Sequence, residues 1–456
     1  MLASLLGVCF GQSVTLSKRS GPPTTRIEVS GKGFADDTAI EIYFGVTELA
    51  LTSSNSSGSF SSNIEVPSSA TPGEFAVTAV QVSNGASASA VFRVNTNWAE
   101  IGFGAGGTRF NAYENVLNTG NANSIGLLWK FTTGFNIDSS PAYVNGVVYI
   151  GSDDNNFYAL NAATGAKLWS FATGSYIVSS PAVANGVVYV GSLDNNIYAL
   201  NAATGVKLWS FTTGGYVVSS PVVVNGVVYS GSNDGNVYAL NAATGALFWS
   251  FATGNVVASS PAVANGVVYV GCNDNNIYAL NAATGDQIWS FATGGFVTST
   301  PVVSSGVAYA GSWDNNLYAL NATTGAELWS FATGLEIDSS PAVADGVVYV
   351  GSADENLYAL NAASGAKIWS FSTSPGPVCS SPAVANGVVY FGSCNYYVYA
   401  LNAATGATLW SFTSGPFVVD SSPAVVNGIV YFGSYDDNVY AFGLAGPQKK
   451  LRTRQP

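Results

Sequence analysis

Residues 179–214, SSPAVANGVVYVGSLDNNIYALNAATGVKLWSFTTG, show a unit that recurs through most of this 456-residue chain. A Ser-Pro motif, Thr-Pro in one copy, opens each unit, at Pro141, Pro181, Pro221, Pro261, Pro301, Pro341, Pro382 and Pro423. Successive prolines are 40 or 41 residues apart. A period of about 40 residues with turn signals inside each unit is typical of the four-stranded blade of a β-propeller.

Four strands can be read within the unit. Their sequences are Ser-Pro-Ala-Val, Val-Val-Tyr-Val-Gly, Ile-Tyr-Ala-Leu and Leu-Trp-Ser-Phe, here called the first to fourth strand of a repeat. Asn185 and Gly186 join the first two strands, and Asn-Gly between apolar runs is the strongest short signal for a two-residue hairpin. No segment carries a 3.6-residue apolar period, which excludes helical repeats of similar length.

The number of repeats predicts an eight-bladed ring. The fourth strand carries a tryptophan in eight copies: Trp129, Trp169, Trp209, Trp249, Trp289, Trp329, Trp369 and Trp410. The first of these strands, residues 127–132, precedes any first strand, and the last repeat stops at Phe442 without a fourth strand. Because an open sheet edge invites aggregation, we expect residues 127–132 to pair with residues 437–442 and close the ring.

The repeat also resembles a known family. Residues 159–169, ALNAATGAKLW, are similar to the tryptophan-docking repeat of the quinoprotein dehydrogenases and other PQQ-like propellers, although that family usually has Asp where this chain has Asn161. The resemblance spans about residues 127–442. It implies that each of the eight tryptophans wedges between adjacent blades and that Gly165 and its equivalents occupy tight turns.

The enzymes of that family imply PQQ, a calcium ion, a catalytic Asp and a disulfide between adjacent cysteines. This chain has cysteines only at Cys9, Cys272, Cys379 and Cys394, none of them adjacent, and its repeats lack long insertions. A cofactor site needs several specific polar groups that converge on one ligand. We therefore do not expect PQQ, and we interpret the chain as a non-enzymatic member.

Composition removes further chemistries. The chain has no His, one Met and only 9% charged residues. Without His, the chain cannot form a Ser-His-Asp or Cys-His catalytic site, nor a zinc site with imidazole ligands. Oxygen-ligand metal sites remain open. No run reaches the roughly 20 apolar residues of a membrane span.

Outside the repeats we expect four segments. Residues 1–23 hold a signal-like apolar stretch and a leader, and residues 24–95 alternate as in the Ig-like β-sandwich modules of microbial surface proteins. Residues 96–126, rich in Gly, Asn and Thr, read as a linker. Residues 443–456 form a basic tail typical of disorder. Together these segments favour a secreted, cell-surface or cell-envelope protein.

One face of the ring, called the top, carries the differences between repeats. Connections from a fourth strand to the next first strand, and turns between second and third strands, both lie there. The residue two positions before each Ser-Pro or Thr-Pro motif varies: Asp138, Val178, Val218, Ala258, Thr298, Asp338, Cys379 and Asp420. So does one turn position: Asp153, Leu193, Asn233, Asn273, Trp313, Ala353, Cys394 and Tyr435. Loop drift explains such variation, and so does a binding surface, for which we select Trp313, Tyr435, Tyr176, Tyr216, Phe296, Phe417, Asp338 and Glu336.

Charge distinguishes this face. Residues 127–442 contain 4 Lys, no Arg and 17 Asp or Glu. Closure of the ring brings carboxylates of the last and first repeats together, and we expect them to form a calcium site or a docking surface for a cationic partner: Asp138, Asp153, Asp154, Asp420, Asp436 and Asp437. For Asp154 and Asp436 the competing interpretation is a turn residue. Nucleic acid is not expected as a partner, because phosphate contacts require Lys or Arg.

Cys379 and Cys394 are predicted to form a disulfide. If Asn386-Gly387 is a two-residue turn, the two cysteines face each other across paired strands, within disulfide reach. Two free thiols are the alternative. A bridge indicates an oxidising compartment.

These observations predict an extracellular or cell-surface binding or scaffold protein that holds a protein or glycan on the top face of its propeller. Self-association stays open. An envelope assembly factor of the type that helps outer-membrane barrels to assemble is the first alternative, and a PQQ-dependent dehydrogenase is the second.

Overall fold

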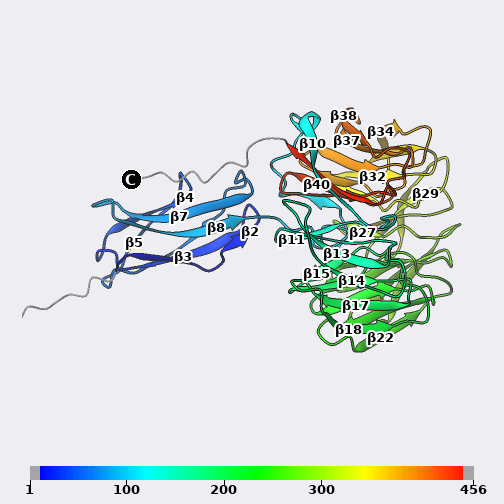
Figure 1. The fold of residues 1–456 in the computed structure, drawn as a ribbon, viewed down its shortest axis with the longest axis horizontal. Helices are drawn as coiled ribbons and strands as arrows, with labels where there is room; N and C mark the ends of the chain where they lie inside the picture. The colour runs from blue at the N-terminus through cyan, green and yellow to red at the C-terminus, as the bar shows by residue number, and fades with distance from the viewer. Residues whose placement is uncertain (1–10, 445–456) are drawn as a thin grey trace, which may run out of the picture. The chain divides into compact units, whose positions relative to one another are not determined.

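The computed structural model describes residues 11–444, which form two compact units, residues 11–96 and residues 97–444 (Figure 1). Both units are built from β-strands, and one 3-10 turn, η1 (Ala122–Ser124), is the helical element of the described chain. No helix in residues 11–444 is long and apolar enough to cross a membrane. The apolar residues 1–10 and the basic tail from residue 445 lie outside the described residues.

The first unit is a two-sheet sandwich. One sheet has the order β1-β3-β6 and the other β2-β8-β7-β4-β5. The strands are β1 (Ser13–Leu16), β2 (Ser20–Gly21), β3 (Arg26–Lys32), β4 (Ala39–Phe44), β5 (Thr47–Ser53), β6 (Phe60–Glu65), β7 (Gly73–Gln81) and β8 (Ser87–Val94). Alternate residues of both sheets, such as Val29, Ile42 and Phe92, fill one core.

The expected leader needs a correction in this unit. Residues 13–16 pair with Val29–Lys32 as β1, and residues 20–21 pair with Arg93 and Val94 as β2. Val14 lies in the core. The segment alternates polar and apolar side chains over only four residues, which is too short to stand out from a leader in the sequence.

The second unit contains eight sheets of repeat strands, the arrangement of a β-propeller. We number them 1 to 8 in chain order. Their first strands are β11 (Ala142–Val144), β15 (Ala182–Ala184), β19 (Val222–Val224), β23 (Ala262–Ala264), β27 (Val302–Ser304), β31 (Ala342–Ala344), β35 (Ala383–Ala385) and β39 (Ala424–Val426). First strands of consecutive sheets contact each other, and β11 also contacts β39, so these strands surround the centre.

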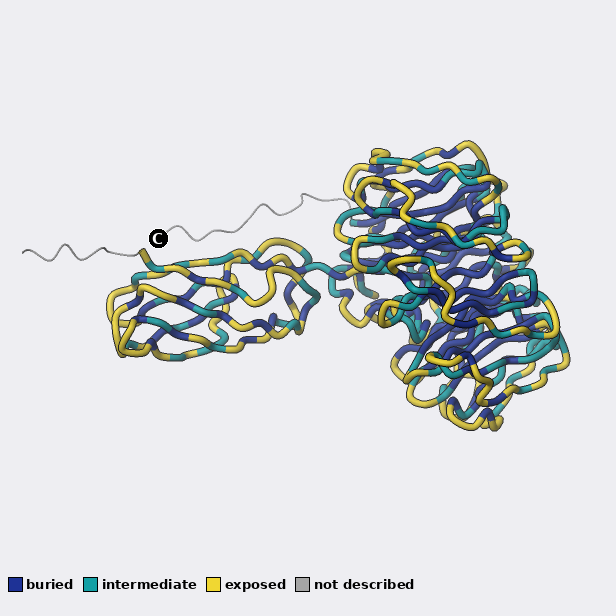
Figure 2. The backbone as a smooth tube through the Cα atoms, turned by 90° about the horizontal axis from the view of Figure 1, so that it is seen from below, coloured by how far each residue is buried: buried dark blue, intermediate teal, exposed yellow. Residues whose placement is uncertain are grey.

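The other three strands of each sheet follow outward. Second strands are β12 (Val147–Gly151), β16 (Val187–Gly191), β20 (Val227–Gly231), β24 (Val267–Gly271), β28 (Val307–Gly311), β32 (Val347–Gly351), β36 (Val388–Gly392) and β40 (Ile429–Gly433). Third strands are β13 (Asn156–Asn161), β17 (Asn196–Asn201), β21 (Asn236–Asn241), β25 (Asn276–Asn281), β29 (Asn316–Asn321), β33 (Asn356–Asn361), β37 (Tyr397–Asn402) and β41 (Asn438–Leu444). Fourth strands are β14 (Lys167–Ala172), β18 (Lys207–Thr212), β22 (Leu247–Ala252), β26 (Gln287–Ala292), β30 (Glu327–Ala332), β34 (Lys367–Ser372), β38 (Thr408–Thr413) and β10 (Ile125–Thr132). Figure 2 shows that the inner strands are buried and that exposed residues collect at the loops.

Local sequence explains each hairpin. Asn185 and Gly186 have φ angles of 50° and 77°, the left-handed backbone of the two-residue turn expected at Asn-Gly. This turn sets Ala182 opposite Tyr189. The same register recurs in the other repeat sheets because the turn recurs.

The predicted closure is confirmed. β10 pairs antiparallel with β41, which brings Leu127 opposite Phe442 and Thr132 opposite Asn438. A second link closes nearer the centre, where the Ser422 amide donates to the Ser140 hydroxyl at 2.9 Å, across 282 residues of chain. The same amide-to-hydroxyl bond joins Ser140 to Ser180 in adjacent sheets at 2.9 Å.

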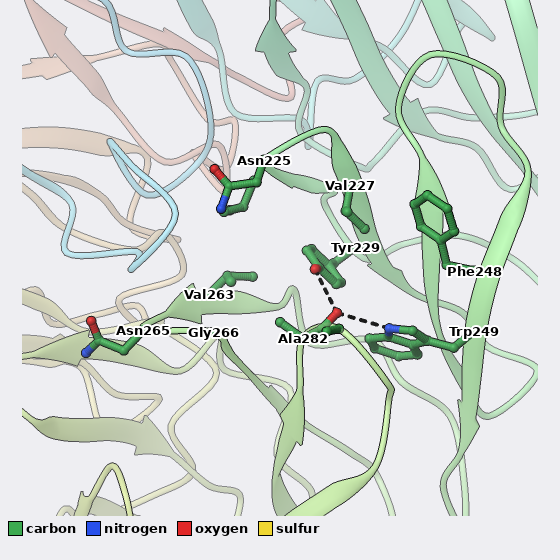
Figure 3. Close-up of a pocket in the computed structure, with 11 residues that line it drawn as sticks. Asn225, Val227, Tyr229, Phe248, Trp249, Val263, Asn265, Gly266 and Ala282 are labelled. Atoms are coloured by element: carbon green, nitrogen blue, oxygen red, sulfur yellow. Dashed lines mark hydrogen bonds between the residues drawn. The ribbon is translucent and has the colours of Figure 1, made fainter.

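The tryptophans dock as the family resemblance implies. Trp249 Nε1 and the Tyr229 hydroxyl both donate to the Ala282 carbonyl of the next sheet, at 3.1 and 2.9 Å (Figure 3). Gly285 lies against the same indole, where a Cβ would come within 2.7 Å of the ring. The pocket of about 610 Å³ at this junction is lined by the docking residues themselves. Six further tryptophans make the equivalent bond: Trp129, Trp169, Trp209, Trp289, Trp329 and Trp369.

Residues 96–126 were expected to be a linker, but residues 97–126 are part of the second unit, so the linker interpretation is wrong. Residues 97–111, here called the axial segment, run past the first strands of all eight sheets. Its carbonyls accept from the amides of β11, β15, β23, β27, β31 and β35, at Tyr143, Val183, Val263, Val303, Val343 and Val384. The Glu100 carboxylate accepts from Val223 of β19, and Asn111 Nδ2 donates to Val425 of β39. Such main-chain bonds need no apolar pattern, so a Gly-rich and Asn-rich sequence conceals them.

The axial segment ends in strand β9 (Phe110–Asn111), which adds to β35 in parallel. Trp98, at its start, is 1% exposed and packs 5.0 Å from Phe103. Each inner strand therefore has its free edge covered, as a propeller requires of edges that would otherwise stay unpaired.

Candidate binding site at the mouth of the ring

The variable top-face residues lie where the first strands begin, around the centre of the ring. They occupy two positions in each repeat: one lies two residues before the Ser-Pro or Thr-Pro motif, and the other directly follows Gly-Ser (Gly-Cys in sheet 4) in the turn to the third strand. We call the sixteen residues at these positions the mouth residues: Asp138, Val178, Val218, Ala258, Thr298, Asp338, Cys379, Asp420, Asp153, Leu193, Asn233, Asn273, Trp313, Ala353, Cys394 and Tyr435.

Tyr435 connects the last sheet to the first. Its hydroxyl donates to Asp138 Oδ1 and lies 3.0 Å from Asp420 Oδ2. Burial and the two carboxylates hold the pKa of Tyr435 far above its usual range. The phenol therefore stays protonated and keeps the two carboxylates in place.

The carboxylates at this junction lose water and repel each other. Burial, with the charge of Asp138, raises the pKa of Asp153 to about 7. Burial raises the pKa of Asp420 to about 6, with further contributions from the charges of Asp138 and Asp338. An unpaired carboxylate gains a proton when it is buried among like charges. This part of the mouth is therefore poised to accept positive charge near neutral pH.

Trp313 is the equivalent of Tyr435 in sheet 5. Its Nε1 donates to Asp338 Oδ1 at 2.5 Å and to Thr298 Oγ1 at 3.1 Å, and those two residues stand in sheets 6 and 5. Phe296 packs against the indole, with ring centroids 5.3 Å apart. The indole is held in place yet remains 44% exposed.

The two aromatic sites thus follow one rule that the sequence comparison missed. In each, an aromatic turn residue holds the mouth residue of its own sheet and that of the next. Aligning the repeats places Trp313 and Tyr435 in one column and Asp338 and Asp138 in another, so the signal was present. Thr298, which completes the first site, was not selected because a threonine carries little chemistry by itself.

The turn aspartates have a different role. Asp194 shows the common pattern: Oδ1 accepts from the Asn196 amide at 3.1 Å, and Oδ2 accepts from the Gly174 amide and the Tyr198 hydroxyl, both at 2.7 Å. Asp154 and Asp436 make the same bonds to the tyrosine four residues on and the amide two residues on. Their oxygens are therefore used by their own turns.

The structure does not assemble the six expected metal-binding carboxylates into one cluster. Asp138 and Asp420 contact Tyr435, and Asp153 interacts with Asp138, whereas Asp154, Asp436 and Asp437 belong to the turns. In residues 11–444, one group of three candidate ligand residues has its atoms within 4.8 Å of one another, and it consists of Cys379, Cys394 and Asp420. The two cysteines are disulfide-bonded, so they offer no thiolate.

The predicted disulfide between Cys379 and Cys394 is confirmed, with Cα atoms 5.7 Å apart. The predicted register holds too, because Ala383 faces Tyr390 across the same hairpin. The bridge joins the two mouth positions of sheet 7, beside Asp420 of sheet 8.

The remaining selected residues lie farther along the top-face connections. Tyr176, Tyr216 and Phe417 are 44%, 54% and 43% exposed. Tyr176 contacts Phe135, with ring centroids 6.2 Å apart, rather than the mouth aromatics. Glu336 is half-buried, and its carbonyl accepts from the Ala353 amide.

Three mouth oxygens are buried without a hydrogen-bond partner in the described part of the chain. They are Asp153 Oδ1, Asn233 Oδ1 and Asn273 Oδ1, all at the same turn position. A buried acceptor with no donor costs free energy that a ligand with N–H groups recovers. The mouth therefore presents acceptors and a fixed aromatic surface, which suits a ligand rich in donors or in positive charge.

Known proteins share this architecture. The protein-family model described as outer membrane protein assembly factor BamB matches residues 115–249, 213–332 and 313–450. The crystal structure of BamB from Moraxella catarrhalis superposes with a TM-score of 0.62 at 20% identity, covering 72% of this chain and 99% of that one. The quinohemoprotein alcohol dehydrogenase from Comamonas testosteroni gives 0.68 at 17% identity, covering 79% and 82%.

A computationally designed protein, Ika8, gives a TM-score of 0.63 at 18% identity, covering 68% of this chain and 97% of the designed one. No curated protein matches the chain. At these identities the structural matches establish the fold and leave the activity open.

Proposed function

We propose, from the premise that the chain belongs to the family described as outer membrane protein assembly factor BamB, that it is a non-catalytic binding protein. Its repeats form an eight-bladed propeller preceded by an Ig-like module, and the mouth of the ring holds a cationic segment of a partner protein. The disulfide between Cys379 and Cys394 favours a secreted or envelope location, since cytosolic proteins are kept reduced.

The observation that carries this proposal is the pair of equivalent aromatic sites. Trp313 and Tyr435 each hold one carboxylate of the next sheet, Asp338 and Asp138, and no Lys or Arg occupies a mouth position. Fixed carboxylates beside the exposed indole of Trp313 attract an ammonium or guanidinium group through its charge and through the ring face. Uncompensated negative charge also speeds the approach of a cationic partner.

An envelope assembly factor is one form of this function. The family membership favours it, because the family's name describes an assembly factor. The fixed, varied mouth on a uniform ring suits a scaffold that holds another protein. A secreted or surface-displayed binding protein uses the same mouth, and the partner distinguishes the two.

PQQ chemistry is not part of this proposal, because the residues present do not fit the group. The disulfide links cysteines separated by 15 residues rather than adjacent ones. The top-face connections are short, as between β14 and β15, where only residues 173–181 intervene. Calcium is a second proposal, in which the ion would have to draw Asp138, Asp153 and Asp420 together, because no three carboxylates in residues 11–444 have oxygens within 4.8 Å of one another.

Binding of a lysine-rich peptide to the full chain tests the proposal. Calorimetric titration at low salt should show binding that weakens as salt is added, because charge drives it. The double variant Trp313→Ala/Asp338→Asn should weaken binding about tenfold, the loss of roughly 1.4 kcal/mol. The control Asp286→Asn/Glu327→Gln removes the same sign of charge from exposed residues outside the top face and should bind like the parent.

Two results would contradict the proposal. Equal loss of affinity in the control variant would mean that net charge alone binds the peptide. Binding of neutral glycans that is independent of salt, with none of the peptide, would replace the protein partner by a carbohydrate.

A further inference from the structure

Arg109 is buried inside the ring as part of the axial segment. Its amide donates to the Gly102 carbonyl and its own carbonyl accepts from Val384 of β35, each at 2.8 Å. The residue is 1% exposed, although arginine is among the side chains most rarely buried. It is also the only cation of the axial segment.

The guanidinium group has no counter-charge in the described chain. Nη1 is buried without a hydrogen-bond partner. Over residues 11–444 the one ion pair joins Arg26 to Glu65, and the two cation–π contacts involve lysines. Glu100, also buried in the axial segment, forms no ion pair with it and accepts a hydrogen bond from Val223 instead.

No acidic side chain elsewhere can serve. Residues 1–10 and 445–456 contain neither Asp nor Glu, so every carboxylate side chain of the protein lies in the described residues. Burial lowers the pKa of Arg109 to about 9, which leaves the group charged at neutral pH. A buried ion without a partner costs several kcal/mol, and proteins compensate such charges.

We propose that the ring binds a small anion at the Arg109 guanidinium, a halide or a carboxylate group. A planar guanidinium donates up to five hydrogen bonds and binds carboxylates in a bidentate way, while a halide needs only charge and donors. The site lies in the axial segment, so it differs in residues and in sign of charge from the acidic mouth. An anion there stabilises the segment that holds the eight first strands.

Bromide reports on the site directly. Crystals of the full chain grown in sodium bromide should show an anomalous scattering peak in contact with the Arg109 guanidinium. In solution, at one ionic strength, chloride or formate should raise the melting temperature above that in gluconate by about 3 °C, since a ligand that binds only the folded state stabilises it. A larger rise in formate identifies a carboxylate, and a larger rise in chloride a halide.

Variants separate this effect from general salt effects. Arg109→Met should lose the anion dependence, and the exposed Arg93→Met should keep it. If Arg109→Met does not fold, the bromide experiment on the parent protein still decides. Absence of a bromide peak at Arg109, together with equal melting temperatures in all three salts, would overturn the proposal.

Discussion

Trp369 and Trp410 occupy equivalent positions in consecutive repeats, yet their surroundings differ. Trp369 donates to the Ala403 carbonyl at 3.0 Å and packs on Gly406. Trp410 faces sheet 8, where β41 pairs with β10 and no turn joins a third strand to a fourth. It packs instead on Phe442, with ring centroids 5.2 Å apart.

The second-strand tyrosines at the same two junctions, Tyr349 and Tyr390, differ in the same way. The Tyr349 hydroxyl donates to Ala403 at 3.1 Å, whereas the Tyr390 hydroxyl, one repeat later, is buried with no partner in residues 11–444. The repeating junctions therefore satisfy their polar groups, and the junction between sheets 7 and 8 does not. Uniform positions therefore build the ring, while departures from the repeat mark places where closure or binding requires other residues.

The docking glycine should give the largest effect. In Gly205→Ala the new Cβ would lie 2.5 Å from Trp169, at a φ of 72°, so strain and overpacking should together cost about 3 kcal/mol of unfolding free energy. Gly186→Ala has φ 77° with nothing within 4 Å and should cost only about 1 kcal/mol. Urea unfolding measures both. Equal costs would show that the tryptophan wedge does not hold the repeating junctions.

Removal of the disulfide should come next. Cys379→Ser/Cys394→Ser opens a loop of 15 residues and should lower the unfolding free energy by about 3 kcal/mol. Cys272→Ser is the control, because serine stands at this position in the other repeats, and it should change little. A parent protein whose stability is unaffected by reductant would contradict the bridge.

The tyrosine pair sharpens the contrast between junctions. Tyr349→Phe removes a made hydrogen bond and should cost about 1 kcal/mol. Tyr390→Phe removes an unsatisfied buried hydroxyl and should be neutral or stabilising by about 1 kcal/mol. Thermal melts of the two variants suffice. Destabilisation of equal size in both would mean that the Tyr390 hydroxyl has a partner after all.

The smallest expected effect concerns pH. The pKa of Asp153 lies near 7 in the folded protein, above its unfolded value, so the folded state holds the proton longer. Stability is therefore present at low pH and is lost as pH rises toward 7 and beyond. Asp153→Asn should reduce the loss of unfolding free energy between about pH 5 and about pH 8 by an amount on the order of 1 kcal/mol, seen as a smaller fall in melting temperature.

The exposed Asp286→Asn serves as the matched control and should follow the parent curve. The pKa values of Glu100 and Asp420 are also raised, so the stability of the Asp153 variant should still fall somewhat as pH rises. A parent protein that gains stability as pH rises through this range would contradict the assignment.

Much of the fold could be predicted from local sequence signals. Asn-Gly turns, the fourth-strand tryptophans and the missing last strand were enough to predict the strands, their register and the pairing of β10 with β41. The axial segment was not predictable in this way, because its bonds to the first strands are made by main-chain groups of a Gly-rich sequence. Arg109 was missed for the same reason.

The sequence predicted which residues belong to the candidate site, but few of the contacts between their side chains. The register of the Asn386-Gly387 hairpin correctly placed Cys379 opposite Cys394. Register alone could not show that Tyr435 links Asp138 to Asp420, or that Asp154 is used by its own turn, because side-chain direction decides both.

Hydrogen–deuterium exchange of the full chain, with and without bound lysine-rich peptide, shows which segments the peptide covers. If the mouth binds the peptide, exchange should slow in the segments that carry the mouth residues of sheets 5, 6, 8 and 1, around Trp313, Asp338, Tyr435 and Asp138. The uniform turns, such as Asn185-Gly186, should be unchanged. Protection confined to residues 11–96 or to those uniform turns would contradict binding at the mouth.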